Sequence, residues 1–272
     1  MGILEHPEQF FSQYILLSGI AHIEPEKQGH PALLGKRLGL LNGSSWITAW
    51  SNYFGRVYLP GAHLVNVGNE AIQMNFMQAY ANGEPCPPQA NIDRFVGYAR
   101  DLVELAQVDA VLITCSTMNR SYQQVSRALE PYGVPVIQID MPMMEKAVSI
   151  GGKILVIATH GPTVASTQEL LSETAQRQGR KVAFDGLTIE EAWQRLAVGD
   201  VAGHNQVLAE AIKAQPIGEY SCVVLAQLSM SALLFSFPDP QAEFNMPVLT
   251  SGQCGFEYAA KVLANLPGAK SK

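Results

Sequence analysis

Short runs of valine, isoleucine and leucine recur along the chain, and the longer segments between them repeat apolar residues with helical periodicity. Apolar runs without polar alternation are typical of strands covered on both faces, and the longer segments are typical of amphipathic helices. The pattern therefore predicts an α/β fold with parallel strands and flanking helices. The clearest predicted strands are 37–41, 110–113, 154–157 and 222–225, with weaker ones at 63–67, 135–139, 181–184 and 247–249. Predicted helices cover 91–107, 119–131, 164–178, 189–197, 203–214 and 254–265.

The two halves of the chain carry a weak internal repeat. Residues 35–43 match 152–160, and 111–118 match 223–230, with similar spacing between the two segments in each half. A duplicated α/β unit explains both matches. We therefore expect two pseudo-symmetric parallel-sheet halves with helices on both faces, the first formed by 35–142 plus 248–272 and the second by 143–247. Residues 1–34 are expected to be an N-terminal extension, with a helical aromatic patch around Phe10, that serves as a packing or homodimer arm.

The ends of the repeated strands are the places where function is expected. In parallel α/β sheets the ligand crevice lies outside the carboxyl ends of the strands. The turns at 42–45, 114–118, 159–163 and 227–231 follow such ends and are rich in short hydrogen-bonding side chains. We therefore expect the active site in a cleft between the two halves, lined by these turns.

Composition narrows the class of partner. The chain has 272 residues, of which 47% are hydrophobic and 15% charged, as expected for a globular enzyme with buried strands. Its formal net charge of −6 and its lack of a basic run argue against binding to nucleic acid. No apolar stretch reaches the roughly 20 residues of a membrane helix and the first residues lack a leader pattern, so a cytoplasmic protein without membrane attachment is expected. The turn Gly43-Ser44-Ser45 matches no nucleotide-binding loop.

Four cysteines lie far apart in the sequence. Cys86, Cys115, Cys222 and Cys254 form no Cys-x-x-Cys pair and have no histidine at ligand spacing, so neither a disulfide framework nor a metal site is expected. Cys115 ends a predicted buried strand and precedes a polar turn and a predicted helix. The positive end of that helix would lower the pKa of the thiol and let it act as a base or nucleophile. The alternative is a buried, inert cysteine.

At these residues the sequence resembles the aspartate/glutamate/hydantoin racemase superfamily. The resemblance lies in the order of three segments, namely the strand, Thr-Cys-Ser-Thr turn and helix at 110–125, the strand at 134–137 and the strand at 153–159, and it covers roughly residues 35–265. It implies two α/β halves that hold a small carboxylate substrate, with one cysteine from each half on opposite faces of its α-carbon. In such enzymes one thiolate removes a proton and the other thiol returns one, without a cofactor. The resemblance thus implies an acid/base role for Cys115.

The second half departs from the family pattern. Gln227 stands where the family's second cysteine is expected, and an amide neither accepts nor delivers a proton usefully near neutral pH. His160, in the turn after the strand at 154–157, is the better candidate for a second proton carrier because imidazole titrates in the useful range. Cys254, at the start of a predicted helix, is a weaker candidate, and Cys222 is expected in the core.

A dense set of short hydrogen-bonding groups accompanies these candidates. Hydroxyls, amides and backbone N–H groups of turns can hold a carboxylate and stabilise the charge of an enediolate. Each such residue could also form a turn or cap a helix. The predicted substrate-binding residues are Asn42, Ser44, Ser45, Ser116, Thr117, Thr159, Thr163, Gln227 and Ser229.

One reactive cysteine fits an isomerase or a lyase of the decarboxylase type better than a symmetric racemase. The leading hypothesis is a cofactor-independent, thiol-dependent enzyme that forms a carbanion or enediolate next to the carboxylate of a small acid, with Cys115 as acid/base. Two alternatives stay open. One is a two-base amino-acid or hydantoin racemase that pairs Cys115 with His160 or Cys254, and the other is a non-catalytic small-carboxylate-binding protein on the same scaffold.

Overall fold

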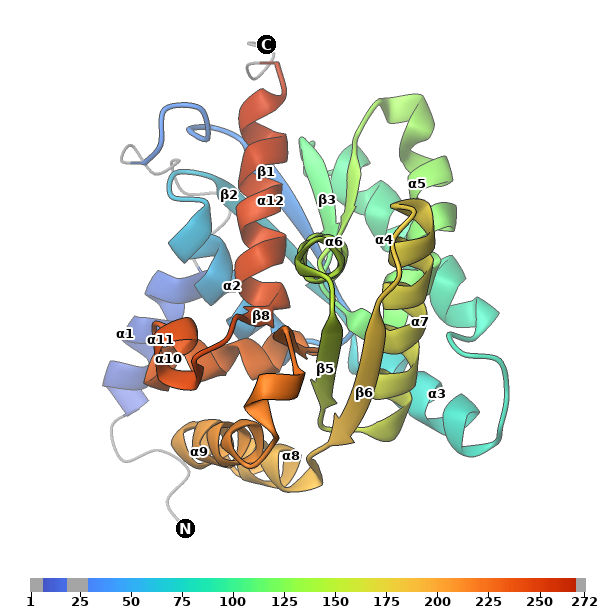
Figure 1. The fold of residues 1–272 in the computed structure, drawn as a ribbon. Coiled ribbons are helices and arrows are strands. Elements are labelled where there is room, and N and C mark those ends of the chain that lie inside the picture. The colour runs from blue at the N-terminus through green and yellow to red at the C-terminus, as the bar shows by residue number, and fades with distance from the viewer. Residues whose placement is uncertain (1–6, 19–28, 268–272) are drawn as a thin grey trace. The chain divides into compact units, whose positions relative to one another are not determined.

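The computed structural model describes residues 7–18 and 29–267 and contains two four-stranded parallel sheets. The strand order is β2-β1-β3-β4 in the first sheet and β6-β5-β7-β8 in the second (Figure 1). The same order in both sheets confirms the predicted α/β class with two similar halves. The strands are β1 (Arg37–Asn42), β2 (His63–Gly68), β3 (Ala110–Ile113), β4 (Val136–Gln138), β5 (Lys153–Ala158), β6 (Ala183–Thr188), β7 (Cys222–Leu225) and β8 (Val248–Thr250).

Helices connect and cover these strands. The α-helices are α1 (Pro7–Ser18), α2 (Ile47–Tyr58), α3 (Glu70–Ala81), α4 (Gln89–Glu104), α5 (Tyr122–Leu129), α6 (Met141–Ile150), α7 (Gly161–Arg177), α8 (Glu190–Ala197), α9 (Val201–Lys213), α10 (Leu233–Ser236), α11 (Pro240–Phe244) and α12 (Ser251–Asn265). Short 3-10 helices are η1 (Ser116–Ser121), η2 (Glu130–Tyr132), η3 (Ile217–Glu219) and η4 (Leu228–Ala232). The predicted helices at 91–107, 164–178, 189–197, 203–214 and 254–265 are confirmed, and the one predicted at 119–131 is an α-helix only at α5, with 3-10 helices on both sides. Helices α2, α3, α6, α10 and α11 were not predicted.

Contacts between residues divide the chain into two compact units. The first comprises the described residues among 1–114, 120–137 and 256–272, and the second comprises 115–119 and 138–255. Strand β8 pairs with β7 in the second sheet, although the predicted first half included all residues from 248 onward. The short segment 115–119 follows a strand of the first sheet and belongs by its contacts to the second unit.

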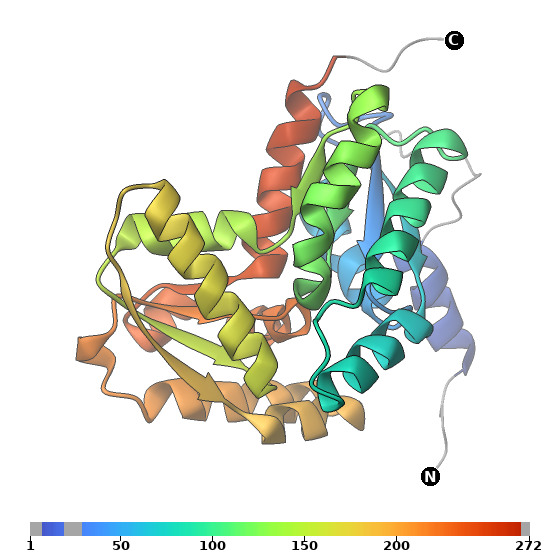
Figure 2. The same cartoon turned by 90° about the vertical axis from the view of Figure 1, so that its right-hand side faces the viewer.

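In the second unit, alternate residues of the sheet face two different layers of helices. Ile154 and Val156 of β5 pack on one face with residues of α6 and α7. Leu155 and Ile157 pack on the other face with residues of α8 and α9. Figure 2 shows α7 along one face of β5 and β6, with α8 and α9 on the opposite side. Because both faces are covered, the central strands are apolar throughout, which explains the unbroken apolar runs in the sequence.

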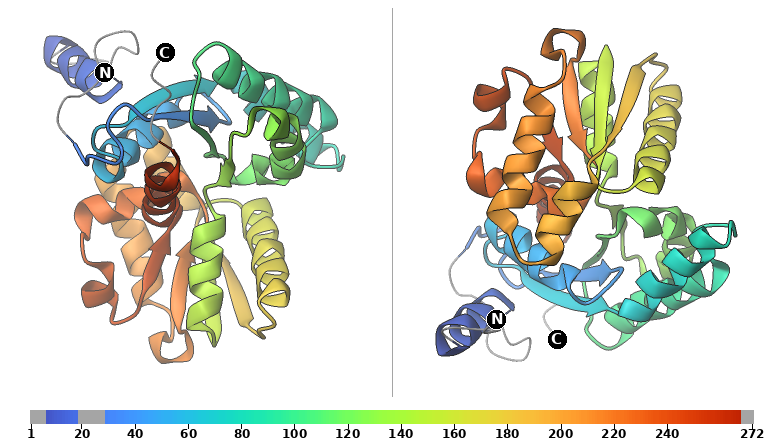
Figure 3. Two further views of the ribbon diagram at one scale, coloured as in Figure 1. Left: turned by 90° about the horizontal axis from the view of Figure 1, so that it is seen from above. Right: turned by 90° about the horizontal axis from the view of Figure 1, so that it is seen from below.

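The sheet of the first unit is covered in the same way. A Cβ atom on Gly39 of β1 would lie 3.0 Å from Leu102 of α4, so this helix packs closely on one face. On the other face, Gly55 of α2 lies against Leu64 of β2. Figure 3 lets the reader follow α2 and α4 on opposite sides of this sheet. Each unit therefore has its own hydrophobic core on both faces of its sheet.

The turn that carries Cys115 has a counterpart in the second sheet. The 3-10 helix η1 begins one residue after Cys115, and η4 begins one residue after Gln227. In both turns the N–H three residues later donates to the carbonyl oxygen, from Met118 to Cys115 and from Met230 to Gln227, each at 3.0 Å. Gln227 therefore occupies the place in the second sheet that Cys115 occupies in the first, as the internal repeat predicted.

The other pair of repeated turns is offset by one residue from the sequence match. The strand ladders align β1 with β5 so that Asn42 corresponds to Ala158. Thr159, which the match of 35–43 with 152–160 had paired with Asn42, lies one position later. That detail of the repeat was wrong because similar apolar runs can be aligned in more than one way, whereas hydrogen-bonded strands have one register.

The N-terminal aromatic patch forms helix α1. Phe10, Phe11 and Tyr14 are exposed on it, and the rings of Phe10 and Phe11 meet edge to face with centroids 5.3 Å apart. No residue of α1 is buried. The helix at this position is confirmed, and its role in a homodimer stays a prediction. The remainder of the predicted extension, 1–6 and 19–28, lies outside the described residues.

Candidate active site

Asn42, at the end of β1, is the centre of a buried hydrogen-bond network in the first unit. Its Oδ1 accepts from the hydroxyls of Ser51 at 2.7 Å and Thr114 at 2.6 Å, and its Nδ2 donates to Oδ1 of Asn66 at 3.1 Å. The side chain is 0% exposed. Because neighbours already occupy both ends of the amide, Asn42 is suited to holding the ends of β1 and β3 together rather than to offering donors to a substrate.

The turn after β1 holds a carboxylate of the protein itself. Glu70, in the first turn of α3, accepts from the backbone N–H of Ser45 at 3.0 Å and also from the Ser45 hydroxyl. These hydrogen bonds hold the pKa of Glu70 below its usual value. Ser45 is exposed, and Ser44 beside it is buried. The turn can therefore bind a carboxylate, and a substrate would have to displace Glu70 from Ser45.

Cys115 follows β3 and is half-buried. Its Sγ lies 3.1 Å from the hydroxyl oxygen of Thr117. Burial raises the pKa of the thiol, hydrogen bonds from Thr117 and from the backbone of Met118 lower it, and the charge of Asp140 raises it. The net shift is upward, so the expected lowering of this pKa by a helix is wrong. The reason is that a six-residue 3-10 helix follows in place of a long α-helix, so few aligned N–H groups oppose burial.

Asp140 is a buried carboxyl group beside this turn that the sequence did not single out. It is 4% exposed, and Asn119 donates from Nδ2 to its Oδ2. Burial raises the pKa of the Asp140 carboxyl group to about 6. The nearby hydroxyls of Ser116 and Ser251 lower this pKa, but by less than burial raises it. In the sequence, the feature that could have pointed to Asp140 is that it is a single acidic residue in the apolar stretch at the carboxyl end of β4.

In the second unit, Gln227 and Thr159 are joined by two hydrogen bonds. The backbone N–H and the hydroxyl of Thr159 donate to Oε1 of Gln227 at 2.7 and 2.9 Å. These donors fix the amide orientation, because a backbone N–H can only donate. Nε2 of Gln227 donates to no acceptor within the described part of the chain. This pairing confirms that the turns after β5 and β7 meet at one edge of the sheet.

His160 follows Thr159 and precedes the first turn of α7. Its ring meets the ring of Trp193 edge to face, with centroids 5.3 Å apart. Burial lowers the pKa of His160, and the charge of Glu190 raises it by less. Its imidazole is therefore neutral near neutral pH and can accept a proton more readily than donate one. The remaining predicted residues of this unit, Thr163 in α7 and Ser229 in η4, are both buried.

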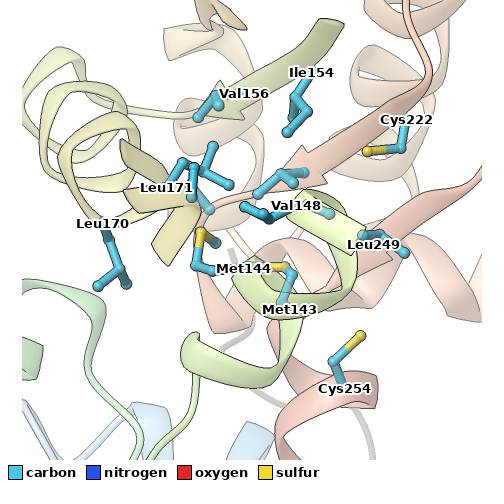
Figure 4. Close-up of a cluster of buried hydrophobic side chains, with 14 of the residues drawn as sticks. Met143, Met144, Val148, Ile154, Val156, Leu170, Leu171, Cys222, Leu249 and Cys254 are labelled. Carbon is cyan, nitrogen blue, oxygen red and sulfur yellow. The ribbon is translucent and has the colours of Figure 1, made fainter. Parts of the chain in front are cut away.

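The other cysteines differ in their surroundings. Cys222 and Cys254 belong to a cluster of buried apolar side chains that includes Met143 and Met144, which Figure 4 shows. Burial raises the pKa of Cys222 to about 12. Cys254 is 6% exposed, so the alternative in which it carries a second proton has no support from its position. Cys86 is exposed, as its loop sequence indicated.

Within residues 7–18 and 29–267, no three histidine, cysteine, aspartate or glutamate side chains gather closely enough to hold a metal ion. Over the same residues, no helix is long and apolar enough to cross a membrane. The cleft predicted between the two halves stays a prediction.

A family model described as Asp/Glu/Hydantoin racemase matches residues 87–259, which is more than half of the chain. A search of the curated proteins found no match. Among solved structures, an aspartate racemase from Picrophilus torridus matches with a TM-score of 0.63 and 14% identity, over 84% of this chain and 94% of that one. A glutamate racemase from Francisella tularensis in complex with D-glutamate has a TM-score of 0.58 and 14% identity, over 86% and 84%. An allantoin racemase from Klebsiella pneumoniae has a TM-score of 0.54 and 15% identity, over 85% and 88%.

Proposed function

Because this chain belongs to the Asp/Glu/hydantoin racemase family, we propose that it is a cofactor-independent, thiol-dependent isomerase or lyase that acts on a small carboxylate. Cys115 is the acid/base group in this proposal. The reaction passes through a carbanion or enediolate next to the substrate carboxylate. The family and its fold support chemistry of the racemase or isomerase type, and the arguments below concern the finer choice.

The observation that carries the proposal is Gln227 in the place equivalent to Cys115. Thr159 binds its oxygen at 2.7 and 2.9 Å, which leaves the two amide N–H groups as donors. Such donors suit a carboxylate, whereas an amide cannot carry a proton between solvent and substrate. We therefore assign Gln227 to carboxylate binding and leave proton transfer to a single thiol.

Burial supports a resting state in which this thiol donates a proton. The pKa of Cys115 is raised by burial, so the thiol keeps its proton near neutral pH. In a decarboxylase-type lyase, loss of CO₂ leaves the electron pair of the broken C–C bond on an enediolate. The enediolate carbon takes the proton of the thiol to form a C–H bond, and the thiolate regains a proton from solvent. No initial base is needed in this order of events.

Turnover on a panel of small mono- and dicarboxylates tests the proposal, with products followed by NMR in D₂O. We expect Cys115→Ser to lower kcat by about 100-fold or more, the range in which positioned acid/base groups act. Cys86→Ser, which changes an exposed cysteine, is the control and keeps its activity. Full activity of Cys115→Ser would sink the assignment, and carboxylate binding without turnover of any acid would favour the non-catalytic alternative.

The neutral imidazole of His160 favours one second candidate, a two-base racemase. Burial lowers the pKa of His160, so it could remove a proton while Cys115 returns one to the opposite face. A two-base racemase would incorporate deuterium into both enantiomers and lose turnover in His160→Gln. The lyase places deuterium on one face and keeps turnover in that variant.

A further inference from the structure

Asp140 is a buried carboxyl group to which the proposed chemistry gives no role. Asn119 binds its Oδ2, whereas its Oδ1 has no hydrogen-bond partner among the described residues. Oδ1 of Asn119 also lacks a partner within that part of the chain. Buried polar atoms are nearly always paired, and leaving one unpaired is costly. Two such atoms on one hydrogen-bonded pair of side chains point to a site that is kept for a purpose other than stability.

The same carboxyl group is connected to the turn that carries Cys115. Asn119 lies at the far end of this turn, and besides binding Asp140 it accepts from Nε2 of Gln138 through its backbone oxygen at 2.6 Å. The Ser116 hydroxyl, next to Cys115 in the chain, is a neighbour of the Asp140 carboxyl group. The pKa of the Cys115 thiol is set by burial, by hydrogen bonds and by one charged side chain, which is Asp140.

We propose that Asp140 is a positioning residue that holds the 115–119 turn through Asn119 and sets the ionisation of the Cys115 thiol by its charge. Two acidic groups that repel each other when both are ionised favour a state with one negative charge between them. Ionised Asp140 keeps the thiol protonated. When the thiol has given its proton to another group, the new thiolate makes Asp140 take up a proton from solvent more readily, so the pair keeps one negative charge. Only the use of this pair in catalysis rests on the proposed function. The ionisation of the two groups can be measured without a substrate.

The direct test is the pH dependence of Cys115 alkylation by iodoacetamide, followed residue by residue with mass spectrometry. Asp140→Asn keeps the shape of the side chain and removes its charge. We expect the midpoint to fall by about one pH unit, so alkylation below the midpoint becomes about tenfold faster. Glu145→Gln makes the same charge change at an exposed position of α6 and is expected to leave the midpoint unchanged. An Asp140→Asn midpoint equal to that of Glu145→Gln would overturn the proposal.

A second measurement uses the wild-type protein and does not depend on a variant that folds. Iodoacetate is negatively charged and iodoacetamide is neutral, and both react with the same thiolate. The ratio of their rates at one cysteine therefore reports the local charge and not the thiolate fraction. As Asp140 ionises near pH 6, the ratio of the iodoacetate rate to the iodoacetamide rate at Cys115 should fall by about fivefold, which corresponds to about 1 kcal/mol of repulsion from one charge. A flat ratio would contradict the proposal.

His160 loses a positive charge in a neighbouring pH range, so it needs its own control. The fall in the ratio should persist in His160→Gln and disappear in Asp140→Asn, and the reverse pattern would overturn the proposal. Exposed Cys86 supplies an internal reference in the same samples and is expected to show no step near pH 6. If the alkylation of Cys115 behaves as expected but the protein turns over no carboxylate, the proposed function is refuted and the role assigned to Asp140 still holds.

Discussion

Gln227 binds Thr159 through its oxygen and presents its amide N–H groups elsewhere, so two substitutions separate the two roles. Gln227→Glu keeps an oxygen acceptor for Thr159 and replaces the amide nitrogen with a charged oxygen. Gln227→Leu removes the acceptor and the donors together. We therefore expect the glutamate variant to keep its stability and lose carboxylate binding, and the leucine variant to lose both.

The sizes of these effects follow from the geometry. Thr159 is 1% exposed, and Gln227→Leu leaves its backbone N–H and hydroxyl without the acceptor now at 2.7 and 2.9 Å. An unpaired buried donor costs about 1–3 kcal/mol, so we expect the free energy of unfolding to fall by about 2 kcal/mol. Gln227→Glu should cost less than about 1 kcal/mol. The glutamate variant also loses a hydrogen bond to the charged ligand, which contributes about 1.5–3 kcal/mol to binding. The Kd for a carboxylate should therefore rise by about 10–150-fold.

Urea unfolding followed by circular dichroism measures the first effect, and calorimetric titration with a small carboxylate measures the second. Gln241→Glu, at an exposed position of α11, is a control for the chemical change and should alter neither quantity. The reasoning is refuted if Gln227→Glu binds the carboxylate as tightly as the wild type. It is also refuted if Gln227→Leu unfolds at the same urea concentration as Gln227→Glu.

Two further predictions concern stability. Burial raises the pKa of Asp140 from 3.8 to about 6, so the folded protein binds this proton more tightly than the unfolded chain and loses stability as the pH rises through that range. The full loss is about 3 kcal/mol, and about 2 kcal/mol of it falls between pH 4 and pH 7. Urea unfolding at these two pH values should show a pH dependence weaker by about 2 kcal/mol in Asp140→Asn, and an equal dependence in both proteins would contradict this. A Cβ atom on Gly255 would lie 2.5 Å from the Ile139 side chain, whereas one on Gly97 would have nothing within 4 Å. Gly255→Ala should therefore cost about 1–3 kcal/mol and Gly97→Ala should stabilise by up to about 1 kcal/mol, and similar effects of the two would contradict this account.

Helix α3 shows why sequence periodicity missed a helix. Its aromatic residues and methionines lie on exposed as well as buried positions, so no single apolar stripe stands out. Met74 and Met77 of α3 are 71% and 50% exposed, although their residue types suggest burial. Methionine and aromatic side chains also suit pockets and interfaces, and the sequence alone does not separate these uses.

The candidate site, like the helices, could be predicted from the sequence only in part. The sequence placed Cys115, Thr159 and Gln227 at strand ends, because an apolar run that stops at a polar turn marks a strand end in any order of strands. It could not place Asp140 beside the 115–119 turn, because the partner that binds it, Asn119, is 21 residues away. It also misjudged the pKa of Cys115, because burial acts through atoms that are distant in the chain.

By itself, the sequence determined the alternation of strands and helices, the duplicated sheet and the identity of the single thiol at the end of β3. These features depend on local periodicity and on the match between two stretches of the same chain. Only the tertiary structure decided the one-residue offset of the repeat, the orientation of the Gln227 amide and the charge balance between Cys115 and Asp140. Register, hydrogen-bond partners and desolvation depend on which residues meet in space, and folding brings together residues that the sequence keeps far apart.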